Sequence, residues 1–330
     1  MKPEGLSEPL AGADNTVWYD WNGRQALSLS QGVPFEEWMA HPNHPGTFAW
    51  HPEGFPIFLR PTEISQMDEY AEDDPYAVAR NLDTPFQRHR VETTLALLRR
   101  VAGGSTRILD VACGEGHLTE AMRRAFPEAE FHAFDGSLTA IRSAQGRYAG
   151  ISFAVASAYD PPYAPECFDC LVCNNIWEHV PDPLHLLERI GRCLKPGGHL
   201  ILSTPSRYRL NNLWRVLAGR RVVLGSRHHV TEYSVGQVME QLRYGNFEVE
   251  EVSGKPLRSR GGQSGGRLSG AWRPPCRGRL TSFAPTMSSG KRRFIWLGSP
   301  PMRSRWLEGL VKRNSPSLWR TTSNTCGQDN

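Results

Sequence analysis

Two carboxylates and two closely spaced glycines follow short apolar stretches in the middle of this chain. Ile108-Leu109-Asp110-Val111 has the composition of a buried strand, and the turn Ala112-Cys113-Gly114-Glu115-Gly116 follows it directly. Glycine lets the backbone turn sharply and approach a ligand closely, and the N–H groups at the start of a helix bind anionic groups. Because Asp110 is an acid in the same place, the sequence predicts a site for a ligand that carries both a positive charge and a carboxylate.

A second acid ends the next apolar stretch, where Phe131-His132-Ala133-Phe134 leads into Asp135 and Gly136. An acid about 20–25 residues beyond a glycine turn can accept both ribose hydroxyls of a nucleoside. The alternative is that Asp135 only caps the following helix, together with Ser137. The distance of Asp135 from Gly114 along the chain favours the ribose role.

Strands and helices alternate in the pattern around these residues. We expect strands near 107–112, 129–134, 150–155, 168–174, 198–204 and 246–252, helices near 117–126, 137–146, 183–193 and 232–244, and an earlier helix within 66–101. This alternation predicts an α/β fold with a doubly wound, mostly parallel sheet and helices on both faces. Ligands of such sheets bind outside the carboxyl ends of the strands, where the strand order reverses.

Two further motifs follow the predicted fourth strand. The strand ends at Asn174 and is followed by Glu178-His179-Val180-Pro181-Asp182, and later by Leu194-Lys195-Pro196-Gly197-Gly198. The second motif predicts the end of a helix and a reversal of the chain, with Lys195 capping the helix.

These motifs, in this order, resemble those of class I S-adenosylmethionine (SAM) dependent methyltransferases over about residues 107–252. The family pattern is an acid followed by Gly-x-Gly-x-Gly, and here Ala112 replaces the first glycine. A site for NAD would carry a glycine at position 119, where this chain has threonine. The resemblance implies a Rossmann-like fold, SAM as cofactor, and the cofactor-binding residues Asp110, Ala112, Cys113, Gly114, Gly116, Asp135, Gly136, Ser157, Ala158, Tyr159 and Asn174.

The stretch after the third strand departs from the family pattern. Many members carry an aspartate, which holds the adenine amino group, at the position of Ser157. The resemblance implies that Ser157 accepts a hydrogen bond instead, while Ala158 supplies a backbone N–H and Tyr159 an apolar wall. The alternative is an ordinary loop with a surface tyrosine.

His179 is the candidate general base, because it follows the fourth strand and because the usual pKa of histidine suits proton transfer near neutrality. Glu178 and His179 could instead only fix the loop and the start of the next helix. His228 and His229 lie in a predicted loop that could cover the substrate. Cys167, Cys170 and Cys173 are spaced like metal ligands, but on a buried strand alternate side chains diverge, so we expect no metal site.

Charge is distributed unevenly along the 330 residues, whose net charge is +4. Residues 253–330 contain fifteen basic and two acidic side chains among many Gly, Pro and Ser residues. We therefore predict three regions: a substrate-covering cap over 1–100, a SAM-binding domain over 101–252 and a disordered basic tail over 253–330. The tail is either an arm for nucleic acid or a frame-shifted end.

The favoured function is methyl transfer to a heteroatom of a small molecule. The alternatives are an RNA methyltransferase that uses the basic tail, which is not favoured, and a protein that binds SAM without turnover. The irregularly spaced cysteines and the lack of a signal sequence or membrane span predict a cytoplasmic protein.

Overall fold

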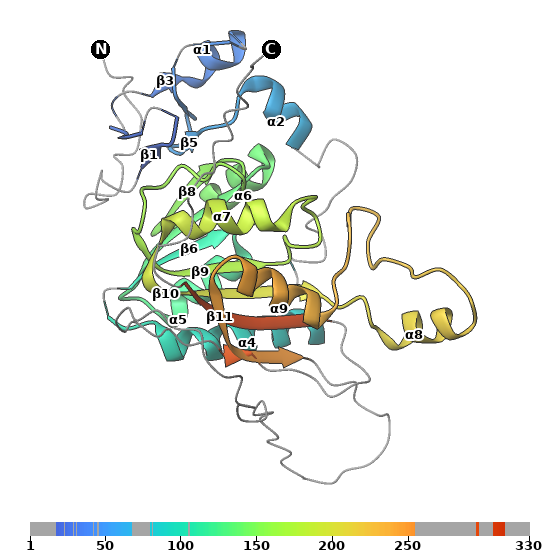
Figure 1. Ribbon diagram of the computed structural model, residues 1–330. Helices are drawn as coiled ribbons and strands as arrows, with labels where there is room; N and C mark the ends of the chain where they lie inside the picture. Colours follow the sequence, from blue (N-terminus) through green and yellow to red (C-terminus); the bar gives the residue numbers. More distant parts are fainter. Residues whose placement is uncertain are drawn as a thin grey trace, which may run out of the picture.

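A computed structural model describes most of the chain and places the predicted elements in one large sheet (Figure 1). The described residues are 18–22, 24–28, 30, 32–41, 43–44, 46–67, 80, 82–104, 106–254, 295–296 and 306–313. Within these ranges no helix combines the length and the apolar character needed to cross a bilayer.

Five parallel strands form the centre of the sheet, in the order β8 (Ile151–Val155), β7 (Glu130–Asp135), β6 (Arg107–Val111), β9 (Phe168–Asn174) and β10 (Leu194–Pro205). The chain runs outward from β6 to β7 and β8, and then returns to β9 on the other side of β6. The strand order therefore reverses between β6 and β9, as the doubly wound pattern predicts.

Helices begin where the sequence supplies a cap. Thr84 caps α4 (Pro85–Val101), Ser137 caps α6 (Leu138–Arg147), and Asp182 caps α7 (Pro183–Cys193). Ser234 and Gln237 form a capping box at α9 (Val235–Tyr244). Each cap accepts a hydrogen bond from a backbone N–H that the first helical turn cannot satisfy, so the helix starts are fixed locally.

The turn after α7 differs from the prediction. Lys195 does not cap the helix: its Nζ lies 2.8 Å from Oδ1 of Asp169 at the start of β9. A Cβ at Gly198 would come within 2.9 Å of the Asp169 carbonyl oxygen, which requires glycine there. Lys195 thus ties β10 to β9.

Side chains of the central strands alternate between two apolar layers. Leu109, Leu171 and Cys173 pack in the layer that includes α7 and α9, whereas Ile108 and Cys170 pack in the layer that includes α4, α5 (His117–Ala125) and α6. Cys170 and Cys173 thus lie on opposite faces of the sheet, as the strand geometry predicts. Both thiols are buried, and burial raises their pKa, so they act as small apolar groups.

The N-terminal region extends the sheet beyond β8. β5 (Pro56–Ile57) pairs with β8, followed by β4 (Ala49–Trp50) and β3 (Val33–Pro34). β1 (Tyr19–Asp20) and β2 (Gln25–Ala26) form a separate hairpin, and α1 (Phe35–Ala40) and α2 (Pro61–Met67) complete the region. These elements lie at one end of the molecule (Figure 1). A substrate-covering role for this region stays a prediction.

Two short segments of the predicted basic tail form strands, whereas disorder of the tail as a whole stays a prediction. β13 (Trp306–Arg313) lies between β10 and β11 (Phe247–Gly254) and is antiparallel to both, and β12 (Ile295–Trp296) also pairs with it. The sheet therefore has the antiparallel strands with which a class I domain normally finishes. Residues 255–294, 297–305 and 314–330 lie outside the described residues.

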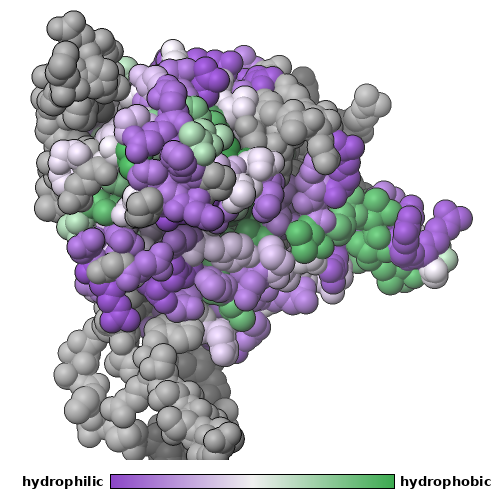
Figure 2. Space-filling model, turned by 90° about the horizontal axis from the view of Figure 1, so that it is seen from above, coloured by the Kyte–Doolittle hydropathy of each residue, from purple (hydrophilic) through white to green (hydrophobic). Residues whose placement is uncertain are grey.

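An unpredicted helix, α8 (Leu210–Leu217), lies on an arm between β10 and α9 (Figure 1). Trp214 is 64% exposed and Leu217 is 77% exposed, and Figure 2 shows an apolar surface along this arm. Asn212 anchors the helix, because its side-chain amide donates to the carbonyl of Arg207 and its Oδ1 accepts from the N–H of Val223.

Candidate functional site

The predicted site residues gather at the carboxyl ends of β6, β7 and β9. Asp110 lies one residue before the end of β6, Asp135 ends β7 and Asn174 ends β9. Since these strands are parallel neighbours, their ends share one edge of the sheet. The edge includes the point of strand reversal, which is where ligands bind in such folds.

The glycine turn has the backbone shape that its sequence predicts. The φ angle is 57° at Ala112, 56° at Gly114 and 72° at Gly116. A Cβ at Gly116 would lie 3.1 Å from Phe153 Cζ and 3.2 Å from Ala144 Cβ, so glycine is needed there for space as well as for conformation. Ala112 adopts the left-handed conformation that the family's glycine allows, and this strains an alanine.

Asp135 joins the turn to the end of β7. The N–H of Gly114 donates to Asp135 Oδ2 at 2.7 Å, and the N–H of Ser137 donates to Asp135 Oδ1 at 2.9 Å. The Ser137 hydroxyl accepts from the N–H of Ala140 and caps α6. Ser137 is therefore the residue that caps α6, and Asp135 does not form the cap itself. Asp135 instead holds Ser137 in place.

Asp110 is buried and is held by α5. The Thr119 hydroxyl donates to Asp110 Oδ2 at 2.6 Å. Burial raises the pKa of Asp110 to about 7, partly offset by the Thr119 hydrogen bond and by the charge of Arg90, while the charge of Asp135 raises it further. A cationic ligand beside this carboxyl would favour its ionised form.

This set of groups fits SAM, the cofactor that the resemblance implies. No side chain caps the first turn of α5, whose N-cap is Gly116, and the backbone N–H groups there suit a carboxylate. Two acids line the same edge, which suits a sulfonium, an amino group and ribose hydroxyls. The donors and acceptors are thus of the right kinds for the two ends of this molecule.

Ser157 and Tyr159 are both engaged within the protein. The Ser157 hydroxyl accepts from the N–H of Tyr159 at 3.2 Å. The Tyr159 hydroxyl accepts from the N–H of Asp182, and its ring packs against His185, with ring centroids 5.2 Å apart. Tyr159 therefore ties this loop to the start of α7, which corrects the picture of a free surface tyrosine.

The side chain of Asn174 is buried and turned to structural partners. Its Nδ2 donates to Thr94 Oγ1 on α4 at 3.4 Å, and its Oδ1 accepts from Ser203 Oγ on β10 at 2.8 Å. These two bonds fix the orientation of the side chain. The backbone of Asn174 remains at the strand end, where the predicted contact can still be made.

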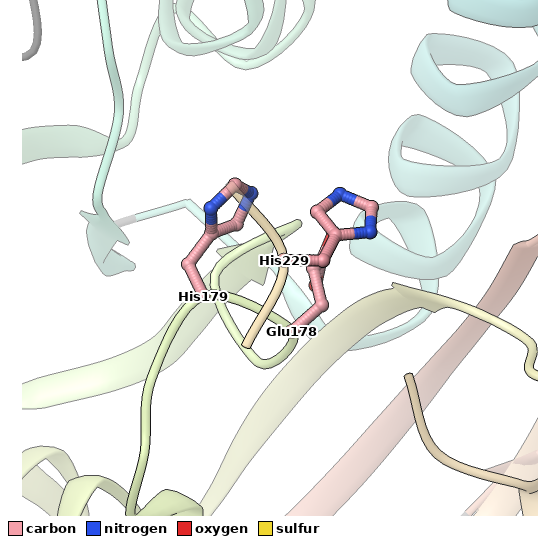
Figure 3. Close-up of side chains that lie close together, drawn as sticks. All are labelled: Glu178, His179 and His229. Atoms are coloured by element: carbon pink, nitrogen blue, oxygen red, sulfur yellow. The ribbon is translucent and has the colours of Figure 1, made fainter. Parts of the chain in front are cut away.

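Glu178, His179 and His229 form a cluster beyond β9 (Figure 3). Glu178 is fully buried; Asn175 Nδ2 donates to its Oε1 at 3.1 Å and Thr204 Oγ1 donates to its Oε2 at 3.0 Å. Burial raises the pKa of Glu178 to about 7. The rings of His179 and His229 meet edge to face, with centroids 5.0 Å apart.

The electrostatics at His179 differ from those expected of a general base. Burial, together with the neighbouring His229 and His228, lowers the pKa of His179 to about 4. The expected match to neutral pH is therefore absent, because the buried ring and its histidine neighbours disfavour the imidazolium. At neutral pH the ring is a neutral lone-pair donor, and its participation in proton transfer stays a prediction.

Sequence reasoning missed three residues of this region, and two of them carry no local signal. Thr119 binds Asp110, Thr204 binds Glu178, and Glu232 binds His229 through a carboxylate 2.8 Å from Nδ1. Each partner pair is brought together by the fold. For Thr119 alone, its place in the first turns of a helix that follows the glycine turn offers a hint.

Comparison with known proteins identifies the family of the chain. A methyltransferase domain family matches residues 70–252. The ubiquinone biosynthesis O-methyltransferase of Xanthomonas campestris pv. campestris (strain B100) is 32% identical over 173 residues, which are 49% of this chain and 72% of that protein. The protein of the same name from Xylella fastidiosa (strain M23) is 29% identical over 172 residues, 49% of this chain and 70% of that protein.

Among solved structures, a SAM-dependent methyltransferase from Mesorhizobium loti is similar with a TM-score of 0.45 and 17% identity, over 71% of this chain and all of that one. The chain belongs to the methyltransferase domain family. It is a class I enzyme of the SAM-dependent type, with a Rossmann-like α/β fold and SAM as its cofactor.

Proposed function

We propose that this enzyme methylates an oxygen atom of a small molecule. Support comes from the curated relatives, which are named O-methyltransferases. It also comes from the edge of the site, where Asn174-Asn175-Ile176-Trp177 replaces the Asn-Pro-Pro-Tyr type of sequence used for amino groups of nucleic-acid bases. Bound SAM supplies a methyl group made electrophilic by its sulfonium.

The chain's own residues would hold the two ends of the cofactor. The uncapped start of α5 after Gly116 would bind the carboxylate of the cofactor. Asp110, on the strand β6 that precedes this turn, would face the positive charge of the cofactor. Asp135 accepts the ribose hydroxyls, since a carboxylate offers roughly four acceptor sites. Ala158 and Ser157 lie on the loop after β8 and face the adenine.

Alignment is the main task left to the protein, because the methyl group is already activated. Holding an acceptor oxygen in line with it can supply several kcal/mol of the barrier reduction. A hydroxyl acceptor must lose its proton, whereas a carboxylate or phenolate need not. The observation that carries the proposal is the joint placement of Asp110, Asp135 and Gly114 beside the Glu178–His179 segment at one sheet edge.

The first experiment is calorimetric titration of S-adenosylhomocysteine into the full chain. We expect micromolar binding that Asp135→Ala abolishes and that Asp160→Ala, at an exposed position, leaves intact. Transfer of a labelled methyl group from SAM is then measured with phenols and other hydroxyl compounds, with amines and with RNA. Transfer of the label only to amines or RNA would refute an oxygen acceptor. A folded chain that does not bind S-adenosylhomocysteine would refute the cofactor site.

A further inference from the structure

We propose that Arg207, together with Thr231, binds a carboxylate group of the methyl acceptor, so that the acceptor is a hydroxy acid. The inference rests on the proposed function and names the class of molecule within it. Arg207 lies two residues beyond the end of β10. In the described part of the chain, its guanidinium is paired with a hydroxyl and with no carboxylate.

The ends of β9 and β10 form the part of the sheet edge that is left for an acceptor. Most of the proposed cofactor contacts come from β6, β7 and the loop after β8. Ser203 on β10 is paired with Asn174 on β9, so the residues after β10 continue beside the turn that follows β9. Because ligands of such sheets bind outside the strand ends, Arg207 is placed on the acceptor side of the site.

The backbone holds Arg207 on both sides. Its N–H donates to the carbonyl of Tyr233 at 3.0 Å, and its carbonyl accepts from Asn212 Nδ2 at 3.0 Å. Its Nη2 donates to Thr231 Oγ1 at 3.0 Å. The N–H of Thr231 donates in turn to the carbonyl of Glu178 at 3.2 Å. The cation is therefore fixed beside the turn after β9.

Arg207 has more donors than the described protein groups satisfy. A guanidinium carries five N–H donors, and the bond to Thr231 is the one that this guanidinium makes within the described residues. Its Nε atom is buried and has no acceptor there. A buried donor without a partner is costly, and more so when it carries charge. A bound anion would supply the missing acceptors.

The neighbouring acids are engaged with other groups. The carboxylate of Glu178 accepts from two neutral side chains. Arg209, the next cation along the chain, is paired with Glu232, whose side chain is fully buried. The positive charge of Arg209 is thus neutralised inside the protein, whereas that of Arg207 is left for a ligand.

The available groups match a carboxylate better than a phosphate. Two N–H groups of a guanidinium fit the two oxygens of a planar carboxylate. The Thr231 hydroxyl accepts from Arg207 and keeps its own hydrogen for the same anion. A phosphate group carries roughly two negative charges near neutral pH and would call for a second cation, but Arg209 is already paired.

The test compares hydroxy acids with their uncharged counterparts on the full chain. Methyl transfer from labelled SAM is measured with hydroxybenzoates, with aliphatic hydroxy acids and with the amide of each acid. We expect kcat/KM for the best acid to exceed that for its amide at least about tenfold, because a hydrogen bond to a charged group is worth roughly that factor or more. The label should be in an ether, which resists mild base.

Substitutions then assign the preference to Arg207. Arg207→Met should lower kcat/KM for the acid at least about tenfold, mainly through KM, and leave the amide unchanged. Arg207→Lys keeps the charge but not the fork, so it should lie between. Thr231→Val should weaken the acid less than Arg207→Met does. The matched control is Arg220→Met, which removes the same charge from an exposed position on the arm and should react as the unaltered chain does.

Three results would overturn the carboxylate site. They are amides that react as well as the acids, an Arg207→Met variant that loses acid and amide alike, and label that mild base releases. Such label would be an ester, which would place the carboxylate at the methyl group instead of at Arg207. Thermal unfolding and S-adenosylhomocysteine binding show that each variant is folded and loaded.

If no compound is methylated, each acid is titrated by calorimetry into the chain loaded with S-adenosylhomocysteine. Acid binding that Arg207→Met abolishes, without transfer to any hydroxyl compound, supports the carboxylate site and refutes the proposed function alone. No acid binding by the loaded, folded chain refutes the carboxylate site. Transfer to uncharged hydroxyl compounds without a preference for acids also refutes the carboxylate site, and leaves the proposed function standing.

Discussion

The N–H of Gly114 donates to the Oδ2 atom of Asp135 across 2.7 Å, so the glycine turn after β6 and the end of β7 form a single unit. The same carboxylate accepts from Ser137 with its other oxygen. Hydrogen bonds from backbone amides to an ionised acid are about twice as strong as neutral ones. Asp135 therefore shapes the turn in addition to any contact that it makes with a ribose.

Replacing Asp135 by Asn tests this double role. An amide has only one oxygen, so its NH₂ group must face one of the two backbone donors. We expect unfolding to become easier by about 1–3 kcal/mol and affinity for S-adenosylhomocysteine to fall at least tenfold. Asp160→Asn, at an exposed ion pair with Arg189, is the control. The free energy of unfolding is measured in urea and the affinity by calorimetry. Equal effects of Asp135→Asn and Asp160→Asn on both quantities would refute the double role of Asp135.

A methyl group at Gly116 should damage both the fold and the site. The residue has φ of 72°, and a Cβ would press on Phe153 and Ala144. We expect Gly116→Ala to lower the free energy of unfolding by more than about 1 kcal/mol and to reduce cofactor affinity. Gly146→Ala, in α6 where a Cβ meets nothing, should raise stability by about 0.5–1 kcal/mol. Stabilisation by both substitutions would contradict this account.

Ala112 offers the opposite change. It stands where the family has glycine and keeps φ at 57°, which strains a residue with a Cβ. We expect Ala112→Gly to raise the free energy of unfolding, by less than about 1 kcal/mol because the unfolded chain also gains freedom. Urea unfolding would measure this. A loss of stability would mean that the methyl group packs well enough to outweigh the strain.

The centre of the fold could be predicted because each signal there is local. β9 begins and ends at the predicted residues, and so does α7, since Asp182 and Pro183 mark its start. The alternation of apolar residues likewise placed Cys170 and Cys173 on opposite faces. The positions of Asp110, Gly114 and Asp135 at the ends of two predicted strands were enough to predict that they share one edge of the sheet, because neighbouring parallel strands end together.

The rest depends on pairings between distant segments. The strand Trp306–Arg313 mixes basic and apolar residues, and only its pairing with β10 identifies it. α8 shows apolar residues on its exposed side, so burial does not explain its pattern. The contact between His179 and His229 joins positions fifty residues apart through the carbonyl of Glu178. No local motif reports such a contact.

Asp110 should make stability depend on pH. Burial raises its folded pKa from 3.8 to about 7. The folded state therefore holds a proton that the unfolded state has already released. The stabilisation is complete below about pH 4 and is lost as the pH rises through about 7. At pH 8 the folded state must keep a buried carboxylate ionised, which costs up to about 4 kcal/mol.

Asp110→Asn removes this titration and can still accept from Thr119. Relative to the unaltered chain, we expect the variant to gain stability between pH 4 and pH 8, measured as the difference in free energy of unfolding in urea. Thr119→Val is the matched change, because it removes the hydrogen bond that favours ionisation and should raise the pKa further. A difference between Asp110→Asn and the unaltered chain that stays constant from pH 4 to pH 8 would show that Asp110 titrates normally, and that burial at the end of β6 does not govern its charge.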